Sequence, residues 1–107
     1  MADKSTDAQH LEYITNMIRK AGHENQSRGK TQVYAKTVPS VAIEIGAGTG
    51  IVVAVHQGVA HVFINSHGSN VDGTCYTTHD SGIERCVQYV VGYADGFERA
   101  ISLPRLD

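Results

Sequence analysis

The feature that most constrains the fold is a stretch of β-branched residues in which apolar side chains recur at every second position. The alternating segments are 31–38, 41–45, 51–56 and 59–64. Short breaks containing glycine, proline or serine separate them at 39–40, 46–50 and 57–58. Because short turns join antiparallel neighbours, the pattern predicts a four-stranded antiparallel β-meander.

The turn lengths also predict how these strands pair. A two-residue turn at 57–58 and three-residue turns at 47–49 and 38–40 set the expected pairs His56–Val59, Ile45–Ile51 and Ala35–Ile43. The large apolar side chains then share one face of the sheet. The predicted inner face consists of Val33, Ala35, Val41, Ile43, Ile45, Ile51, Val53, Val55, Ala60, Val62 and Ile64.

Helical periodicity appears on both sides of the predicted sheet. Thr6 and Gln9 have capping-box spacing before an apolar stripe that runs to Ala21 and stops at Gly22. Ser81 and Glu84 form a second box, which predicts a helix ending near residues 95–96. Residues 97–103 could add a short final strand. The expected fold is therefore α+β, with an N-terminal helix, the meander and a C-terminal helix on the same sheet face.

Size and composition indicate a small domain that can fold without disulfide bonds or structural metal ions. The chain has 107 residues, so we expect a single domain over 6–103 and a flexible tail at 1–5. The net charge of −2 and scattered basic residues make nucleic-acid binding unlikely. The polar N-terminus does not resemble a secretory signal, and no apolar run is long enough for a membrane helix. Cys75 and Cys86 are expected to be free thiols in the cytoplasm.

The residues Glu44-Ile45-Gly46-Ala47-Gly48-Thr49-Gly50 form a glycine-rich turn after a strand. This motif, over about ten residues from Val41, resembles the first motif of class I methyltransferases. The resemblance implies S-adenosylmethionine bound against the 46–50 turn, with a helix after it. The residues that follow Gly50 instead favour a strand, and a hairpin turn accounts for the same glycines. A nucleotide-like ligand at this turn therefore remains one alternative.

Histidine and cysteine supply a second alternative. His56 and His61 should share the outer face of adjacent strands, and the polar segment 65–82 that follows is expected to be a long loop. That loop contains His67, Cys75 and His79. Imidazole and thiolate bind zinc and also serve nucleophilic catalysis, so a metal site or a Cys/His enzyme is possible. The spacing matches no established zinc or catalytic motif, so scattered surface residues are the simpler explanation.

The outer face of the predicted sheet is more apolar than a solvated face should be. An apolar patch with a polar rim is typical of an interface, unless the C-terminal segment covers it within the chain. The residues expected at this interface are Tyr34, Lys36, Glu44, Val52, His56, Val59, His61 and Phe63. Contacts are also expected from His67, Asn70, Asp72, His79 and Asp80 in the following loop.

The sequence therefore predicts a non-enzymatic protein-binding module without a cofactor, acting as a homodimer or on another protein. By analogy, small stand-alone domains of this kind serve as inhibitors or adaptors, including those of phages and mobile elements. A small-ligand or metal binder and a Cys/His enzyme are the alternatives.

Overall fold

The computed structural model describes residues 4–46 and 48–102 and contains two helices and five strands. The elements in chain order are α1 (Lys4–Lys20), β1 (Gln26–Val33), β2 (Lys36–Gly46), β3 (Thr49–His56), β4 (Val59–Ser66), β5 (Ser69–Thr77) and α2 (Gly82–Ser102). All neighbouring strands are antiparallel, and the sheet order β1-β2-β3-β4-β5 follows the chain. The predicted α+β class and antiparallel meander are confirmed.

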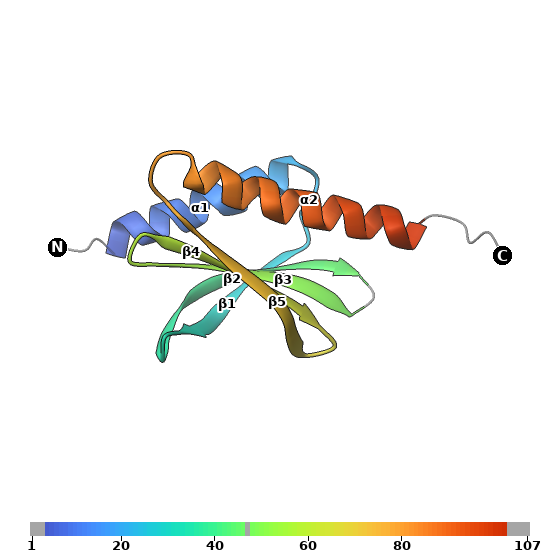
Figure 1. Cartoon of the computed structure of the whole chain (residues 1–107), viewed down its shortest axis with the longest axis horizontal. Helices are drawn as coiled ribbons and strands as arrows, with labels where there is room; N and C mark the ends of the chain where they lie inside the picture. The colour runs from blue at the N-terminus through green and yellow to red at the C-terminus, as the bar shows by residue number, and fades with distance from the viewer. Residues whose placement is uncertain (1–3, 47, 103–107) are drawn as a thin grey trace.

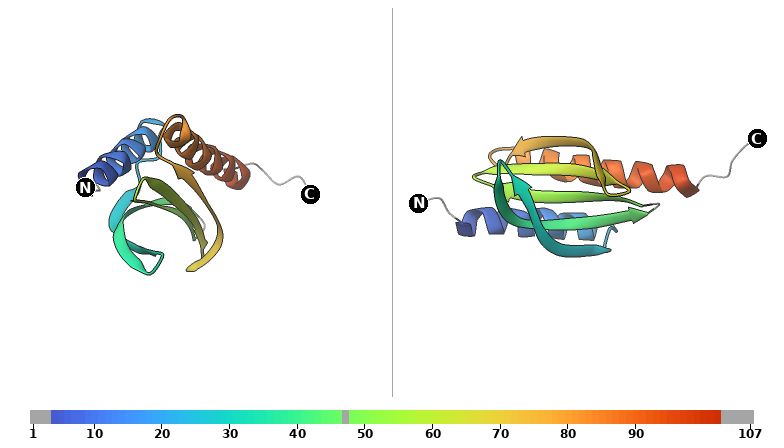
Figure 2. Two further views of the ribbon diagram at one scale, coloured as in Figure 1. Left: turned by 60° about the vertical axis from the view of Figure 1, so that its left-hand side comes forward. Right: turned by 90° about the horizontal axis from the view of Figure 1, so that it is seen from below.

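The sheet is curled into a gutter, and both helices lie on its convex side (Figures 1 and 2). The main core fills the space between the helices and this convex face. Its buried residues are Leu11, Ile14, Ile18, Val41, Ile43, Ile45, Ile51, Val53, Val55, Ala60, Val62, Ile64, Ile83, Cys86, Val90 and Ala94. Both helices therefore pack on one sheet face, as the single apolar stripe of each helix predicts.

The N-terminal helix begins at Lys4, two residues before the predicted start. Its first turn is attached to the sheet by Asp7, whose carboxylate accepts hydrogen bonds from the backbone N–H groups of Gln57 and Gly58 at 2.8 and 3.1 Å. Gln57 and Gly58 have φ angles of 51° and 78°, as expected for the two-residue turn between β3 and β4.

The first hairpin differs from the prediction. Its turn lies at Tyr34-Ala35, and β1 starts at Gln26, five residues before the predicted start of the first strand at residue 31. Pro39, the expected break, lies inside β2 and pairs with Lys30. The edge strand β1 is polar because most of it is exposed, so alternation of apolar residues could not reveal it.

The register between β3 and β4 is the predicted one, with His56 opposite Val59. Between β2 and β3, Ile43 rather than Ile45 lies opposite Ile51. Gly46 pairs with Thr49, so the turn is one residue shorter than predicted, and a register shift between Glu44 and Gly46 adds the second residue of the difference. Because the error is two residues, the apolar side chains still share the predicted face. The exceptions are Ala35, which lies in the turn, and Val33, which lies on the opposite face.

The segment expected to be a long loop contains β5, which pairs along β4 after a tight turn at His67-Gly68. Like β1, this edge strand has few apolar residues and is mostly exposed. The prediction of a loop over 65–82 was wrong for this physical reason. Only a short connection, residues 78–81, separates β5 from α2.

The second helix continues through Gly92 and Gly96 to Ser102, so no final strand forms at 97–102. Tertiary packing of one continuous apolar face outweighs the helix penalty of the two glycines. Leu103 lies outside the described residues. No helix in the described part of the chain is long and apolar enough to cross a membrane.

Candidate functional site

The concave face of the gutter carries a second, smaller apolar cluster. Val33, Val38 and Ala54 are buried there, and Phe63 packs against them. These residues come from β1, β2, β3 and β4, so the cluster crosses most of the sheet. Within the described residues both helices lie on the other face (Figure 2), and no helix or strand covers the concave side. We call these four residues the concave cluster.

Three rings lie in a row beside the concave cluster. The rings of Tyr34 and His61 meet edge to face, with centroids 5.4 Å apart and planes at 85°. The rings of His61 and Phe63 are nearly parallel, with centroids 6.3 Å apart and planes at 7°. Such arrangements are favourable for rings and extend the concave cluster toward the first hairpin turn.

Among these three rings, that of His61 has a polar atom without a hydrogen-bond partner. The residue is only 7% exposed, yet its Nε2 atom is buried and has no hydrogen-bond partner among the described residues. Burial lowers the pKa of His61 below its usual value, and the nearby charge of His56 lowers it further. At neutral pH the ring is therefore uncharged. A buried polar atom without a partner costs free energy, so this position lowers the stability of the fold.

The turn that presents Tyr34 is strained. Tyr34 and Ala35 have φ angles of 51° and 66°, in the left-handed region where Asn and Gly are preferred. Each non-glycine residue there costs about 1 kcal/mol. Tyr34 is nevertheless 78% exposed, so burial of the ring does not compensate for the strain.

A groove opens at the same end of the sheet. Pairing between β2 and β3 ends at Ser40–Ala54, because the next β2 residue, Pro39, has no N–H to donate. The β1–β2 hairpin then separates from β3, and the space between them and α1 has a volume of about 720 Å³. The groove is lined by Asp7, Ala8, Leu11, Glu12, Arg28, Lys36, Thr37, Val38, Pro39, Val55, His56 and Gln57.

Charges at the rim of this groove are partly paired. Glu12 and Arg28 form an ion pair. The hydrogen bond from Arg28 lowers the pKa of Glu12, and the same bond raises the pKa of Arg28. Lys36 and Asp7 add one charge of each sign to the lining, which also contains apolar residues. Mixed charge over apolar residues suits an amphipathic segment better than a strongly charged ligand.

Five of the predicted interface residues fall in two separate groups. Tyr34, His61 and Phe63 come together in the ring row, whereas Lys36 and His56 line the groove. Of the remaining three, Val52 lies opposite Phe63 and Val59 lies opposite His56, whereas Glu44 lies toward the other end of β2. Val33 and Val38 were not predicted as site residues, because the register placed Val33 inside and the turn was expected at Val38.

The predicted contacts in the following loop do not form one cluster. His67 lies at the turn before β5, Asn70 and Asp72 lie in β5, and His79 and Asp80 follow it. Because β5 has nine residues, its two ends are about 30 Å apart. A partner that contacts all of them must therefore span the length of β5.

The predicted metal ligands are also dispersed. Within the described residues, the group of three His, Cys, Asp or Glu ligands is formed by His23, Asp95 and Glu98, none of which was predicted. Cys75 lies directly across from His61 in the β4–β5 ladder, not beside His67 or His79. Cys75 is exposed, and Cys86 is buried in the core, which raises the pKa of its thiol to about 12. The more reactive thiol would be Cys75 even without catalysis, since the Cys86 thiol is buried and protonated.

The glycine-rich turn joins two antiparallel strands and is not followed by a helix. Gly48 has a φ of 75°, and a Cβ atom there would lie 2.7 Å from Nδ1 of His67. The turn and the close imidazole explain the glycine without a ligand. The resemblance to class I methyltransferases therefore does not extend to the structure, because β3 follows this turn where that family has a helix.

The chain matches no protein-family model, no curated protein and no solved structure at a significant level.

Proposed function

We propose that this protein is a protein-binding module and that its partner docks on the concave face of the sheet. The observation that carries the proposal is the concave cluster with its row of rings, which lies opposite both helices. An apolar surface rimmed by polar groups is typical of an interaction site.

The chemistry of this face defines the partner. The exposed ring of Tyr34 and the partly buried ring of Phe63 favour a segment with apolar side chains. Val33, Val38 and Ala54 are already buried and support these rings from within the sheet. The groove between α1 and β2 opens on the helix side of the sheet and is separate from this face. An apolar stretch of another protein meets these requirements, and a second copy of this chain is the competing occupant.

Backbone strain also supports a binding role for the first hairpin turn. An exposed tyrosine at a left-handed position lowers stability without a contribution from burial. Strain of this kind is concentrated at functional sites, where the surrounding structure maintains it. Exposed tyrosines contribute strongly to binding because they bury a large area with little loss of side-chain entropy.

The experiment is capture of partners by the tagged protein, with Phe63→Asp as the disrupting variant. A charge at the centre of the concave cluster should remove binding of a stoichiometric partner. Val71→Asp is the matched control, because Val71 is 59% exposed in β5, away from the cluster. It should leave capture unchanged.

Two further measurements make the outcome decisive. Thermal unfolding of Phe63→Asp must show that the variant is folded, and sedimentation must show whether the partner is a second copy of this chain. Equal capture by wild type and a folded Phe63→Asp variant would overturn the proposal. Loss of capture only in Val71→Asp would assign the interaction to the β5 edge instead.

A further inference from the structure

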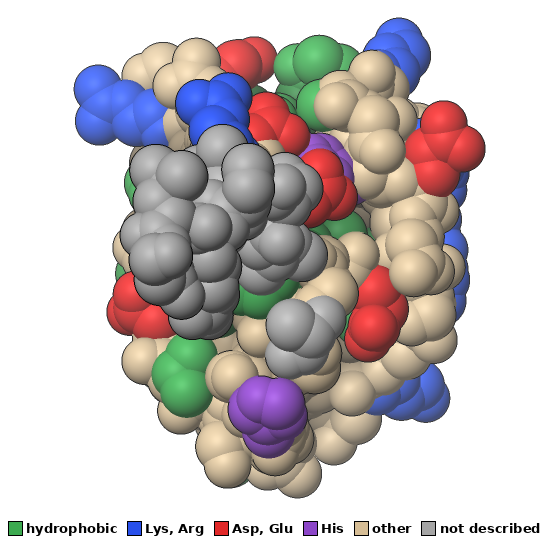
Figure 3. Space-filling model, turned by 90° about the vertical axis from the view of Figure 1, so that its right-hand side faces the viewer, with side chains coloured by type: hydrophobic (Ala, Val, Ile, Leu, Met, Phe, Trp, Pro, Cys, Tyr) green, Lys and Arg blue, Asp and Glu red, His purple; other side chains and the backbone are tan. Residues whose placement is uncertain are grey.

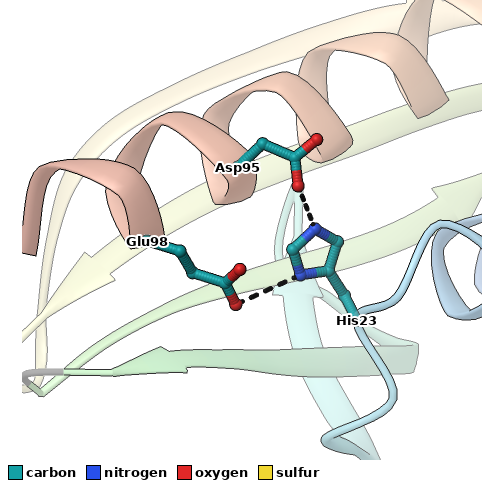
Figure 4. A group of neighbouring side chains, drawn as sticks. All are labelled: His23, Asp95 and Glu98. Carbon is teal, nitrogen blue, oxygen red and sulfur yellow. Dashed lines mark hydrogen bonds and ion pairs between the residues drawn. The ribbon is translucent and has the colours of Figure 1, made fainter. Parts of the chain in front are cut away.

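A second site lies at the other end of the sheet, where the connection between α1 and β1 lies against α2. Three side chains from distant parts of the sequence converge there: His23, Asp95 and Glu98 (Figure 4). His23 follows the end of α1, whereas Asp95 and Glu98 are one turn apart on α2. Figure 3 views this end of the molecule, where acidic side chains surround a histidine.

The position of His23 is fixed by the way α1 ends. Gly22 has a φ of 110°, its N–H donates to the carbonyl of Arg19, and the N–H of His23 donates to the carbonyl of Ile18. These two bonds are those of a Schellman motif, which determines the path of the chain after the helix. The carbonyl of His23 accepts a further bond from Gln26. The ring is 95% buried and therefore cannot reorient freely.

Both ring nitrogens of His23 face carboxylates. Nε2 lies 2.7 Å from Oδ1 of Asp95, and Nδ1 lies 3.4 Å from Oε2 of Glu98. When the N–H is on Nε2, the lone pair of Nδ1 points toward a negatively charged oxygen. The C-terminal end of α1 adds further negative potential. A cation between Nδ1 and Oε2, either a proton or a metal ion, relieves this repulsion.

The spacing of these atoms fits a metal ion. Two ligands held at about 2.0–2.1 Å from a tetrahedral zinc ion lie about 3.4 Å apart, which is the observed separation of Nδ1 and Oε2. Asp95 then holds the opposite nitrogen, the arrangement by which carboxylates orient metal-bound histidines. The side chains of Asp95 and Glu98 are half exposed, so water can complete the coordination.

We infer that His23 and Glu98 bind one divalent transition-metal cation, such as Zn²⁺, with Asp95 as the carboxylate that orients the imidazole. The site is separate from the concave face and does not depend on the proposed partner. Binding releases to solvent any proton that Nδ1 carries, because the metal takes its lone pair. The ion links the α1–β1 connection to α2, so it stabilises the fold.

The test is thermal unfolding of the full chain with added Zn²⁺. At a zinc concentration about ten times the dissociation constant, the melting temperature should rise by about 4–8 °C. Glu98→Gln should lose most of this rise, and Asp95→Ala should weaken zinc binding by about 10–100-fold. Glu84→Gln, at the opposite end of α2, is the matched control and should retain the rise.

Magnesium distinguishes this site from nonspecific binding to carboxylates, because imidazole is a poor ligand for Mg²⁺. Mg²⁺ should produce no rise. Equal zinc-induced rises in wild type and Glu98→Gln would place the zinc at other histidines and overturn the inference. So would the absence of a rise in the wild type, which would leave the group as an ion pair.

Discussion

Two turns at the same end of the sheet contain residues with left-handed backbone angles, but only one of them is supported by hydrogen bonds to another element. At the β3–β4 turn, Gln57 and Gly58 adopt left-handed angles and the carboxylate of Asp7 binds both of their N–H groups. At the β1–β2 turn, Tyr34 and Ala35 adopt similar angles without glycine. The β1–β2 turn should therefore be the less stable of the two, and other residues at its two positions should stabilise the protein.

Replacement of Tyr34-Ala35 by Asn-Gly should stabilise the protein by about 1–2 kcal/mol, because these residues suit left-handed angles. The same double variant should bind the partner more weakly, since it loses the exposed ring. Urea unfolding and an affinity measurement would test both effects. A stabilised variant with undiminished affinity would exclude Tyr34 from the interface.

The uncharged state of His61 has a consequence for stability. Its pKa is lowered in the folded protein, so the unfolded chain binds more protons between that pKa and about 6.5. The contribution of His61 to stability is therefore complete above about pH 6.5 and declines as the pH falls below it. His61→Phe should reduce this loss. Unfolding free energies of both proteins from pH 8 to pH 5 would show it, and equal pH profiles would contradict it.

At the scale of elements, the glycines of α2 have different roles. Gly82 begins the helix where β5 passes closest, and a Cβ atom there would overlap the carbonyl of Thr77 and lie 2.6 Å from its Cγ2 atom. A Cβ atom at Gly92 would meet nothing within 4 Å. One glycine is thus required by packing, and the other only weakens the helix.

Gly82→Ala should destabilise the protein by about 1–3 kcal/mol, because backbone must move to admit the methyl group. Gly92→Ala should stabilise it by about 1 kcal/mol, since alanine has the higher helix propensity. The pair of variants, compared by urea unfolding, tests the contact between β5 and α2. Effects of the same sign would show that this contact is not as described.

The same elements show how far the sequence predicts the fold. The helix stripes and the β3–β4 register were predictable, because burial on one side leaves a clear period in the sequence. The edge strands β1 and β5 were not, because exposed strands need no apolar alternation. The end of α2 was misplaced because propensity at Gly96 suggested a stop, whereas packing of Phe97 on the core extends the helix.

At the scale of the whole molecule, the curvature of the sheet determines which residues meet on its outer, concave face. The apolar outer face was predicted, with Val52, Val59 and Phe63 among its residues, but the curl of the sheet was not. Register irregularities near Gly46 and Asn65, which increase local twist, accompany the curl of the sheet. Curling brings Val33 and Val38 together with Ala54 into a cluster, and the departure of β2 at Pro39 opens the groove. Neither effect leaves a period in the sequence.

The central claim is that the partner binds the concave face, and methyl-labelled NMR of the protein titrated with the captured partner tests it most directly. Val38 and Ala54 report on the concave cluster, whereas Val62 and Val90 report on the core beneath the helices. We predict that the signals of Val38 and Ala54 shift strongly while those of Val62 and Val90 remain nearly unchanged. Shifts confined to Val71 in β5 or to α2, with Val38 and Ala54 unaffected, would contradict the claim.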